Sequence, residues 1–248
     1  MVGICKLCGA SSKLRKSHIL PEFCYQRLYD PLHRYNIVSN DPSVQIGQQQ
    51  KGLRERLLCQ DCESKFSRWE TYSSSVLRGS VKGVRSGDSI FLEGLNYAHL
   101  KLFLLSLIWR AGVSTQRVFQ ETKLGEHEDI IRRMLLDERP GDPSTYGCLV
   151  YSVTIDGYRF CDVIYGPQPC LLENILSYRV MVSGMLFVYF ISATPLKIEI
   201  LKKFLNKAGQ LQVEEKDISE IPFLNDLAME VANFRSQKNS NNKRYTSC

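Results

Sequence analysis

The stretch CKLCG at residues 5–9 and the stretch LCQDCE at residues 58–63 are the two segments from which this 248-residue chain is best understood. Each contains a tight Cys-x-x-Cys turn, and two such turns can present four thiolates in a tetrahedron at about 2.3 Å from one Zn²⁺ ion. The 50 residues between the turns fit an insertion between the two halves of one site. The spacing therefore predicts a structural zinc site on Cys5, Cys8, Cys59 and Cys62.

Two other uses of these cysteines stay open from the sequence alone, namely a redox pair and buried free thiols. A redox Cys-x-x-Cys pair belongs at a strand-to-helix turn in a βαβ unit, a setting that residues 1–90 do not offer. The chain has nine cysteines. The five outside the two turns lie among apolar neighbours and are expected to pack in the core rather than to bind metal.

Between the two turns lies the segment Ser17-His18-Ile19-Leu20-Pro21. The order of paired cysteines, this segment, a loop and a Leu-Cys-x-x-Cys turn that opens a helix resembles the HNH endonucleases with zinc knuckles, of the ββα-metal or His-Me finger superfamily. The resemblance covers roughly residues 1–75. It implies a β-hairpin and a helix that clamp a catalytic divalent cation, hydrolysis of DNA phosphodiester bonds, and a place among the effectors of restriction or anti-phage defence.

The resemblance also implies roles for individual residues. His18 would be the general base, a role that suits a neutral imidazole near pH 7. Glu63, directly after the fourth cysteine, would bind the catalytic Mg²⁺ or Mn²⁺, because both cations accept oxygen ligands. The chain departs from the pattern twice: Ser17 replaces the usual carboxylate ligand, and Arg54 and Glu55 stand where its middle Asn would fall.

The helix expected over residues 63–77 carries Glu63, Ser67 and Glu70 at positions i, i+4 and i+7, so that the three share one face. Two carboxylates could therefore converge on a cation near His18. The alternative is a solvated polar face, with the aromatic residues of the same helix packed inward.

Positive charge is concentrated at the start of the chain. Residues 1–90 contain 14 Lys and Arg against 8 Asp and Glu, whereas residues 91–248 contain 18 of each. Such an excess suits a polyanionic partner such as DNA, because neutralising phosphates releases counterions, although an ordinary basic surface has the same composition. Seven residues around the turns and His18 are the candidate phosphate contacts: Lys13, Arg15, Lys16, Arg54, Arg56, Lys65 and Arg68.

The hydrophobic pattern predicts an α+β fold in three parts. These are a zinc-binding HNH-like module at residues 1–85, a helix plus antiparallel-sheet domain at 90–235 that would dock a protein partner or sense a signal, and a disordered tail at 236–248. Helical periodicity predicts a short helix after Pro21 and further helices over 63–77, 97–113, 126–138 and 196–206. Runs rich in Val, Ile, Tyr and Phe predict strands over 148–155, 158–165, 178–182 and 185–192, and polar residues predict a loop over 36–52.

Composition excludes several classes of protein. With 44% hydrophobic and 23% charged residues, the chain is neither a disordered nor a fibrous protein. No apolar run reaches the roughly 20 residues that span a bilayer, and no cleavable signal peptide is evident, so a soluble cytoplasmic protein is expected. The rival to a nuclease is a non-catalytic zinc-knuckle module that binds nucleic acid or a protein partner, which Ser17 and the missing Asn favour.

Overall fold

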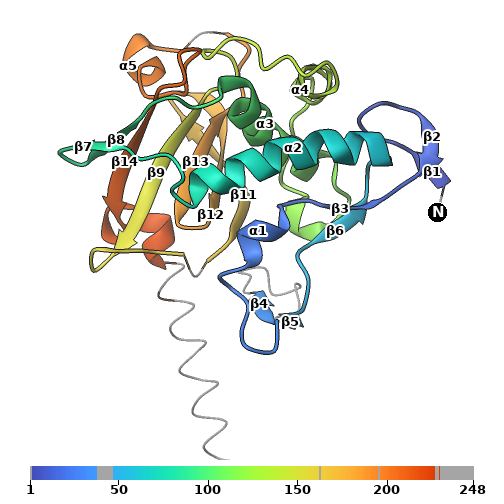
Figure 1. The fold of residues 1–248 in the computed structure, drawn as a ribbon, viewed down its shortest axis with the longest axis horizontal. Helices are drawn as coiled ribbons and strands as arrows, with labels where there is room; N and C mark the ends of the chain where they lie inside the picture. The colour runs from blue at the N-terminus through green and yellow to red at the C-terminus, as the bar shows by residue number, and fades with distance from the viewer. Residues whose placement is uncertain (1, 38–46, 162, 195, 227–228, 230–248) are drawn as a thin grey trace, which may run out of the picture.

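The computed structural model describes residues 2–37, 47–161, 163–194, 196–226 and 229 (Figure 1). The helices are α1 (Glu22–Tyr25), α2 (Gln60–Leu77), α3 (Tyr97–Val113), α4 (His127–Leu136) and α5 (Ile198–Leu201), with 3-10 turns η1 (Arg117–Phe119) and η2 (Ile218–Glu220). The strands are β1 (Val2–Ile4), β2 (Ser11–Lys13), β3 (Lys16–His18), β4 (Tyr35–Ile37), β5 (Gly47–Gln49), β6 (Arg54–Arg56), β7 (Val84–Ser86), β8 (Ser89–Leu92), β9 (Cys148–Ile155), β10 (Tyr158–Arg159), β11 (Tyr165–Leu172), β12 (Ile175–Val182), β13 (Met185–Phe190) and β14 (Leu211–Asp217). The combination confirms the α+β class.

The N-terminal part contains three two-stranded pairs, all antiparallel: β1 with β2, β3 with β6, and β4 with β5. Strand β3 and strand β6 are followed by α2, so this part has the order strand, insertion, strand, helix. The insertion holds α1 and the β4–β5 pair. The prediction of a loop over 36–52 is therefore wrong at residues 36–37 and 47–49, because three-residue strands are too short to give a period-2 signal. Residues 38–46 lie outside the described chain.

The largest sheet has eight strands in the order β11-β12-β13-β9-β14-β8-β7, with β10 paired to β9. Its strands are antiparallel except for β9 and β14, which run parallel, so the prediction of a purely antiparallel sheet is wrong. Strand β14 was also missing from the predicted strands. Only its first half alternates, with Leu211 and Val213 buried, and the charged residues after them mask the pattern.

Helix α3 is buried almost all round, as its uninterrupted apolar sequence predicts. It packs against α2 and α4, and its apolar residues share one core cluster with the sheet strands β9, β12 and β13 (Figure 1). The side chain of Asn96 caps its first turn by accepting a hydrogen bond from the backbone N–H of His99 at 2.9 Å. Each fully buried leucine of this helix contributes roughly 1.5–3 kcal/mol of transfer free energy.

The two parts of the chain share this core. One cluster of buried side chains runs from Cys5 to Val213, and β7 and β8, which flank the predicted boundary at residues 85–90, pair into the large sheet. The division into two domains stays a prediction, and the predicted tail lies outside the described residues. Within the described part of the chain, no helix combines the length and the apolar character needed to cross a membrane.

Lys101 is a buried cation within α3, and its titration predicts a pH-dependent stability. Its side-chain Nζ donates to the carbonyl oxygens of Thr145 and Tyr146 at 2.8 and 2.6 Å. Burial lowers the pKa of Lys101 from 10.5 to about 8. The unfolded chain therefore holds this proton at pH values where the folded chain has lost it, and stability from Lys101 increases as pH rises through this range.

The expected result concerns the difference in unfolding free energy between the parent and Lys101→Met. Between about pH 7.5 and 9.5, the unfolding free energy of the parent should rise by about 2 kcal/mol relative to that of Lys101→Met. Urea titrations at both pH values measure it, and the ionisation of tyrosines and cysteines cancels between the two proteins. A difference that is constant with pH would show that Lys101 remains charged in the folded state.

Candidate active site and metal centre

The four cysteines of the two turns come together, as the spacing predicts. Their sulfur atoms all lie within 4.8 Å of one another, and the Sγ atoms of Cys8 and Cys59 are 3.8 Å apart. A tetrahedron with metal–sulfur bonds of about 2.3 Å has edges of about 3.8 Å, so the donor set fits a zinc ion. Backbone hydrogen bonds hold the turns in register: the N–H of Lys6 donates to the carbonyl of Leu57, and the N–H of Cys59 donates to Cys5 Sγ.

The thiols of this cluster titrate unequally. Burial raises the pKa of Cys5, but the backbone N–H groups of Cys8 and Cys59 outweigh it and lower the pKa to about 7. Burial and the neighbouring thiols raise the pKa of Cys62 far above its usual value. Four close thiols cannot all ionise unless a cation offsets their charge, which is the electrostatic condition that a bound metal satisfies.

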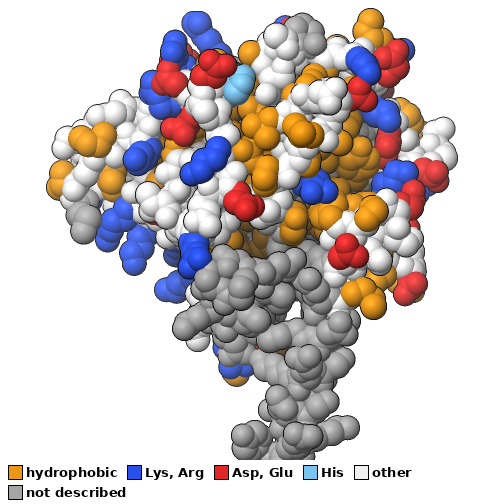
Figure 2. Space-filling model, turned by 180° about the vertical axis from the view of Figure 1, so that it is seen from behind, with side chains coloured by type: hydrophobic (Ala, Val, Ile, Leu, Met, Phe, Trp, Pro, Cys, Tyr) orange, Lys and Arg blue, Asp and Glu red, His pale blue; other side chains and the backbone are white. Residues whose placement is uncertain are grey.

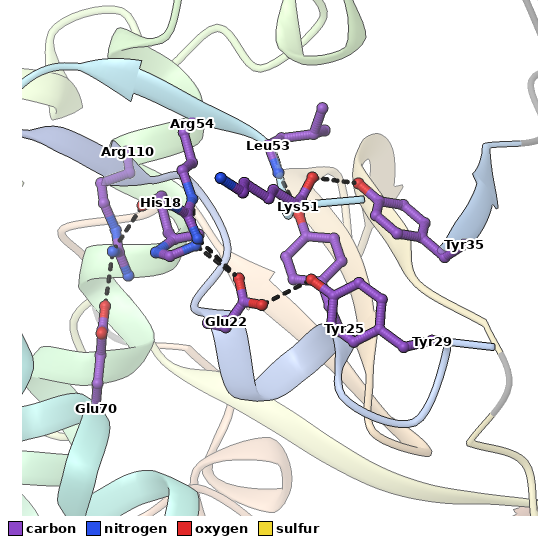
Figure 3. Close-up of polar contacts among 10 residues, drawn as sticks. All are labelled: His18, Glu22, Tyr25, Tyr29, Tyr35, Lys51, Leu53, Arg54, Glu70 and Arg110. Atoms are coloured by element: carbon purple, nitrogen blue, oxygen red, sulfur yellow. Dashed lines mark hydrogen bonds and ion pairs between the residues drawn. The ribbon is translucent and has the colours of Figure 1, made fainter. Parts of the chain in front are cut away.

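His18 ends strand β3 and lies beside the first residue of α1. Its Nε2 is 2.7 Å from Glu22 Oε2 and 2.7 Å from Arg54 Nε (Figure 3). Arg54 is the residue opposite His18 in the β3–β6 pair, and Glu22 is four residues further along the chain. Burial, followed by the charge of Arg54, lowers the pKa of His18, while Glu22 opposes both. The imidazole is therefore held neutral at pH 7.

Glu22 is fixed in turn by groups on its other side. The hydroxyl of Tyr29 donates to Glu22 Oε1 at 2.7 Å, and Arg54 Nη2 lies 3.3 Å from Oε2 (Figure 3). Burial raises the pKa of Glu22, but the hydrogen bond from Tyr29 and the neighbouring His18 and Arg54 lower it below its usual value. Glu22 is therefore an ionised acceptor aimed at the His18 ring.

Arg110 reaches the same place from helix α3. Its Nη1 donates to the backbone carbonyl of His18 at 2.8 Å and to Glu70 Oε1 at 2.7 Å (Figure 3). The guanidinium is 2% exposed and lies over the ring of Phe66, 5.2 Å from its centroid. The buried guanidinium of Arg110 thus connects β3, α2 and α3, and it fixes the backbone of His18 relative to helix α3.

Ser17 and Glu63 occupy the two positions at which the resemblance implies cation ligands, and they contact each other. The hydroxyl of Ser17 donates to Glu63 Oε1. Successive residues of a strand point to opposite faces, so Ser17 and His18 project to opposite sides of the β3–β6 pair. Burial raises the pKa of Glu63, and the hydrogen bond from Ser17 opposes this rise. Glu70, rather than Glu63, shares a cavity with His18.

The four cysteines are the only cluster of three or more His, Cys, Asp or Glu side chains that could hold a metal ion in the described part of the chain. A second cluster of this kind, around Glu63 or His18, is not found there. A catalytic Mg²⁺ or Mn²⁺ on Glu63 therefore stays a prediction.

The seven predicted phosphate contacts divide into two groups. Lys65 and Arg68 turn toward the end of α4, where Lys65 Nζ donates to the carbonyl of Leu136 at 2.8 Å and Arg68 lies 2.8 Å from Glu138 Oε2. An ion pair competes with phosphate for these cations, so they are the weaker candidates.

The other five surround the cysteine cluster and β3, and of these Arg54 is paired with Glu22, so it too is a weaker candidate. Lys16 and Arg56 are exposed and stand directly opposite each other in the β3–β6 pair, on the same face as His18 and Arg54. Like charges at such positions repel, and a polyanion would relieve the repulsion. Lys13 and Arg15 are exposed nearby, and Figure 2 shows Lys and Arg side chains gathered on this side of the molecule.

A cavity of about 720 Å³ opens beside His18. His18, Glu22 and Phe23 line one side of it, and α2 lines the other side with Ser67 and Glu70 among its residues. The cavity therefore offers an imidazole, carboxylates and hydroxyls to one bound molecule, and a few converging polar groups of this kind are what orients a substrate in a binding site.

Comparison with protein-family models, with curated proteins and with solved structures finds no match to this chain. The HNH-like assignment thus depends on the cysteine spacing and on the residues around His18.

Three site residues were not predicted from the sequence: Glu22, Tyr29 and Arg110. A weak signal existed for Glu22, since it follows His18 by four residues across Pro21. Arg110 carried a stronger one, because an arginine inside an apolar helix must find a partner. Neither signal shows that Glu22 or Arg110 contacts His18. These contacts join β3 to α1 and to α3, and a sequence pattern within one element does not show which other element it packs against.

Proposed function

We propose that this protein is a divalent-metal-dependent endonuclease that hydrolyses DNA phosphodiester bonds, with His18 as the general base. The observation that supports it best is the hydrogen bond between the His18 ring and Glu22 at the wall of the cavity. A base oriented by a carboxylate and facing a substrate-sized space is the arrangement that proton abstraction from water requires.

The chemistry follows from the two nitrogens of the ring. Glu22 and Arg54 both approach Nε2, and this nitrogen can either donate to Glu22 or accept from Arg54, not both. The proposal uses the tautomer with the proton on Nε2, which donates to Glu22 while the Arg54 guanidinium bonds to Glu22 instead, and Nδ1 then keeps a free lone pair. Nδ1 takes a proton from water as the water oxygen bonds to phosphorus, and the bond from phosphorus to the leaving oxygen breaks; that oxygen takes a proton from solvent. Tyr29 and Arg54 hold Glu22 in place, and the hydrogen bond from Arg110 to the His18 carbonyl fixes the backbone beneath the ring.

The proposal keeps a divalent cation. Glu63, the predicted ligand, contacts Ser17 and does not line the cavity of His18, which counts against that position; Glu70 lines the cavity with His18 and is the carboxylate that could hold a cation beside the phosphate. Mg²⁺ commonly takes one or two protein carboxylates, and substrate phosphate and water complete its ligands. When bound, the cation supplies positive charge to the phosphate during attack.

A second function has its own supporting observation. Ser17 occupies a position implied for a cation ligand, and the described residues hold no cation cluster besides the cysteines. These features favour a non-catalytic zinc module that binds nucleic acid or a protein partner through the same basic surface.

Cleavage assays separate the two. Purified protein is incubated with supercoiled plasmid and with single-stranded oligonucleotide, in Mg²⁺ and in Mn²⁺. His18→Ala is expected to lower the rate at least 100-fold, the usual contribution of a general base. Glu22→Gln should lower it less and shift the pH dependence, because Gln can still accept from Nε2 but carries no charge.

His99→Ala is the matched control, since His99 packs against Tyr72 on another part of the surface. It should cleave like the parent. The absence of cleavage of both substrates in both metals, or equal cleavage by His18→Ala, would favour the non-catalytic module.

A further inference from the structure

The cavity beside His18 extends along α2 well beyond the residues that the proposed chemistry uses. Ser67, Thr71, Ser74 and Arg78 all line it. They are spaced i, i+4, i+7 and i+11, so they form one face of the helix. Three hydroxyls and a guanidinium therefore lead away from the candidate base, and we call this row the Arg78 wall.

Arg78 is a cation without an acidic partner in the described chain. It is exposed, and its Nη2 donates to the side-chain oxygen of Gln26 at 2.5 Å. That partner is a neutral amide just after α1. A guanidinium held in this way keeps its charge uncompensated, and its planar fork of N–H groups matches two oxygens of a phosphate.

The length of the Arg78 wall indicates how large a ligand would be. Glu70 and the carbonyl of His18 both accept hydrogen bonds from Arg110, so Glu70 marks the His18 end of the cavity. Arg78 is eight residues further along the chain, at the C-terminal cap of α2. At 1.5 Å per residue this separation is about 12 Å. Three to four nucleotide steps of about 3.4 Å, the rise along the axis of B-form DNA, cover this separation, so the phosphates at the two ends of the cavity are not adjacent in the strand.

The walls also select the form of the ligand. Residues from β3 and α1 line one side, and α2 lines the other, so an unpaired nucleotide can contact both sides at once. The volume of about 720 Å³ is in the range of sites that hold small molecules, which favours a single strand over the wider duplex. The hydroxyls of the Arg78 wall can hydrogen-bond to sugar and phosphate oxygens, and such contacts do not depend on the identity of the base.

We propose that this cavity binds a single-stranded segment of nucleic acid, with one phosphate at His18 and a non-adjacent phosphate of the same strand at Arg78. This inference depends on the proposed function for the role of His18, and it adds the substrate class. The strand's backbone would lie along the hydroxyls of the Arg78 wall.

The test measures binding without cleavage. A 5′-fluorescein-labelled single-stranded tetradeoxynucleotide is titrated with the His18→Ala protein in the absence of added divalent cation, and anisotropy gives Kd at several salt concentrations. Adding Arg78→Gln is expected to weaken binding about five- to tenfold. It should also lower the slope of log Kd against log salt by about 0.7, the value for one lost phosphate contact on a single strand.

Lys82→Gln is the matched control, because it removes the same charge four residues later from an exposed side chain that does not line the cavity. It should change Kd less than twofold. Equal weakening by both substitutions would overturn the proposal, since it would indicate only a general electrostatic effect, and so would a duplex that binds as tightly as the single strand. If the strand binds through Arg78 but the parent never cleaves any substrate, the hydrolytic function fails and the strand site stands.

Discussion

Replacing Cys59 with serine is expected to abolish zinc binding and to unfold the two cysteine turns with strands β1 and β2. The four sulfur atoms lie within 4.8 Å of one another, and β1 and β2 have only three residues each. Such short strands have little stability of their own. Metal binding supplies about 10–16 kcal/mol in small zinc modules, so its loss removes most of what holds this segment together.

The measurement has two parts: metal content of the purified protein and amide hydrogen exchange. Exchange protection should be lost in β1, β2 and the second turn. Helix α3 should keep its protection, because it is buried against α2, α4 and the sheet. Cys170→Ser is the control, since Cys170 is a half-buried residue outside the cluster on strand β11. A full zinc equivalent in Cys59→Ser, or loss of zinc in Cys170→Ser, would contradict the four-cysteine assignment.

Replacing Arg110 with methionine is expected to destabilise the protein by about 3–5 kcal/mol, the usual cost of breaking a buried ion pair from one side. The substitution leaves Glu70, whose side chain is 24% exposed, without its cation. It also removes the donor to the His18 carbonyl and the contact with Phe66. Since apolar residues can replace a whole buried pair at little cost, the double variant Arg110→Met with Glu70→Met should regain much of the loss.

Urea unfolding of the parent, both single variants and the double variant measures this coupling. Arg133→Met is the control, because Arg133 is 67% exposed and should change stability by no more than about 0.5 kcal/mol. If Arg110→Met costs less than about 1 kcal/mol, or if the double variant loses the sum of the two single losses, the pair does not act as the buried link described above.

Local patterns account for the parts of the structure that were predicted well. A Cys-x-x-Cys turn has a fixed geometry whatever follows it, and the four cysteines indeed lie together. Helix α3 begins and ends at the predicted residues because its apolar run has a clear start and stop, and the same holds for strand β9. Short strands with polar residues, such as β4 and β5, lack such a signal and were missed.

The sequence by itself determined the α+β class, the cluster of four cysteines, the basic N-terminal part and the most buried helix, because spacing, charge and periodicity are properties of neighbouring residues. Tertiary structure alone decided that β14 runs parallel to β9, that Glu22 and Arg54 flank the His18 ring, and that Arg110 crosses from α3 to its carbonyl. These contacts join residues up to 92 positions apart. Once the core has formed, each buried charge needs an opposite charge or a hydrogen-bond partner, and each strand edge needs a neighbouring strand. A local sequence pattern does not show which distant residue or strand fills that place.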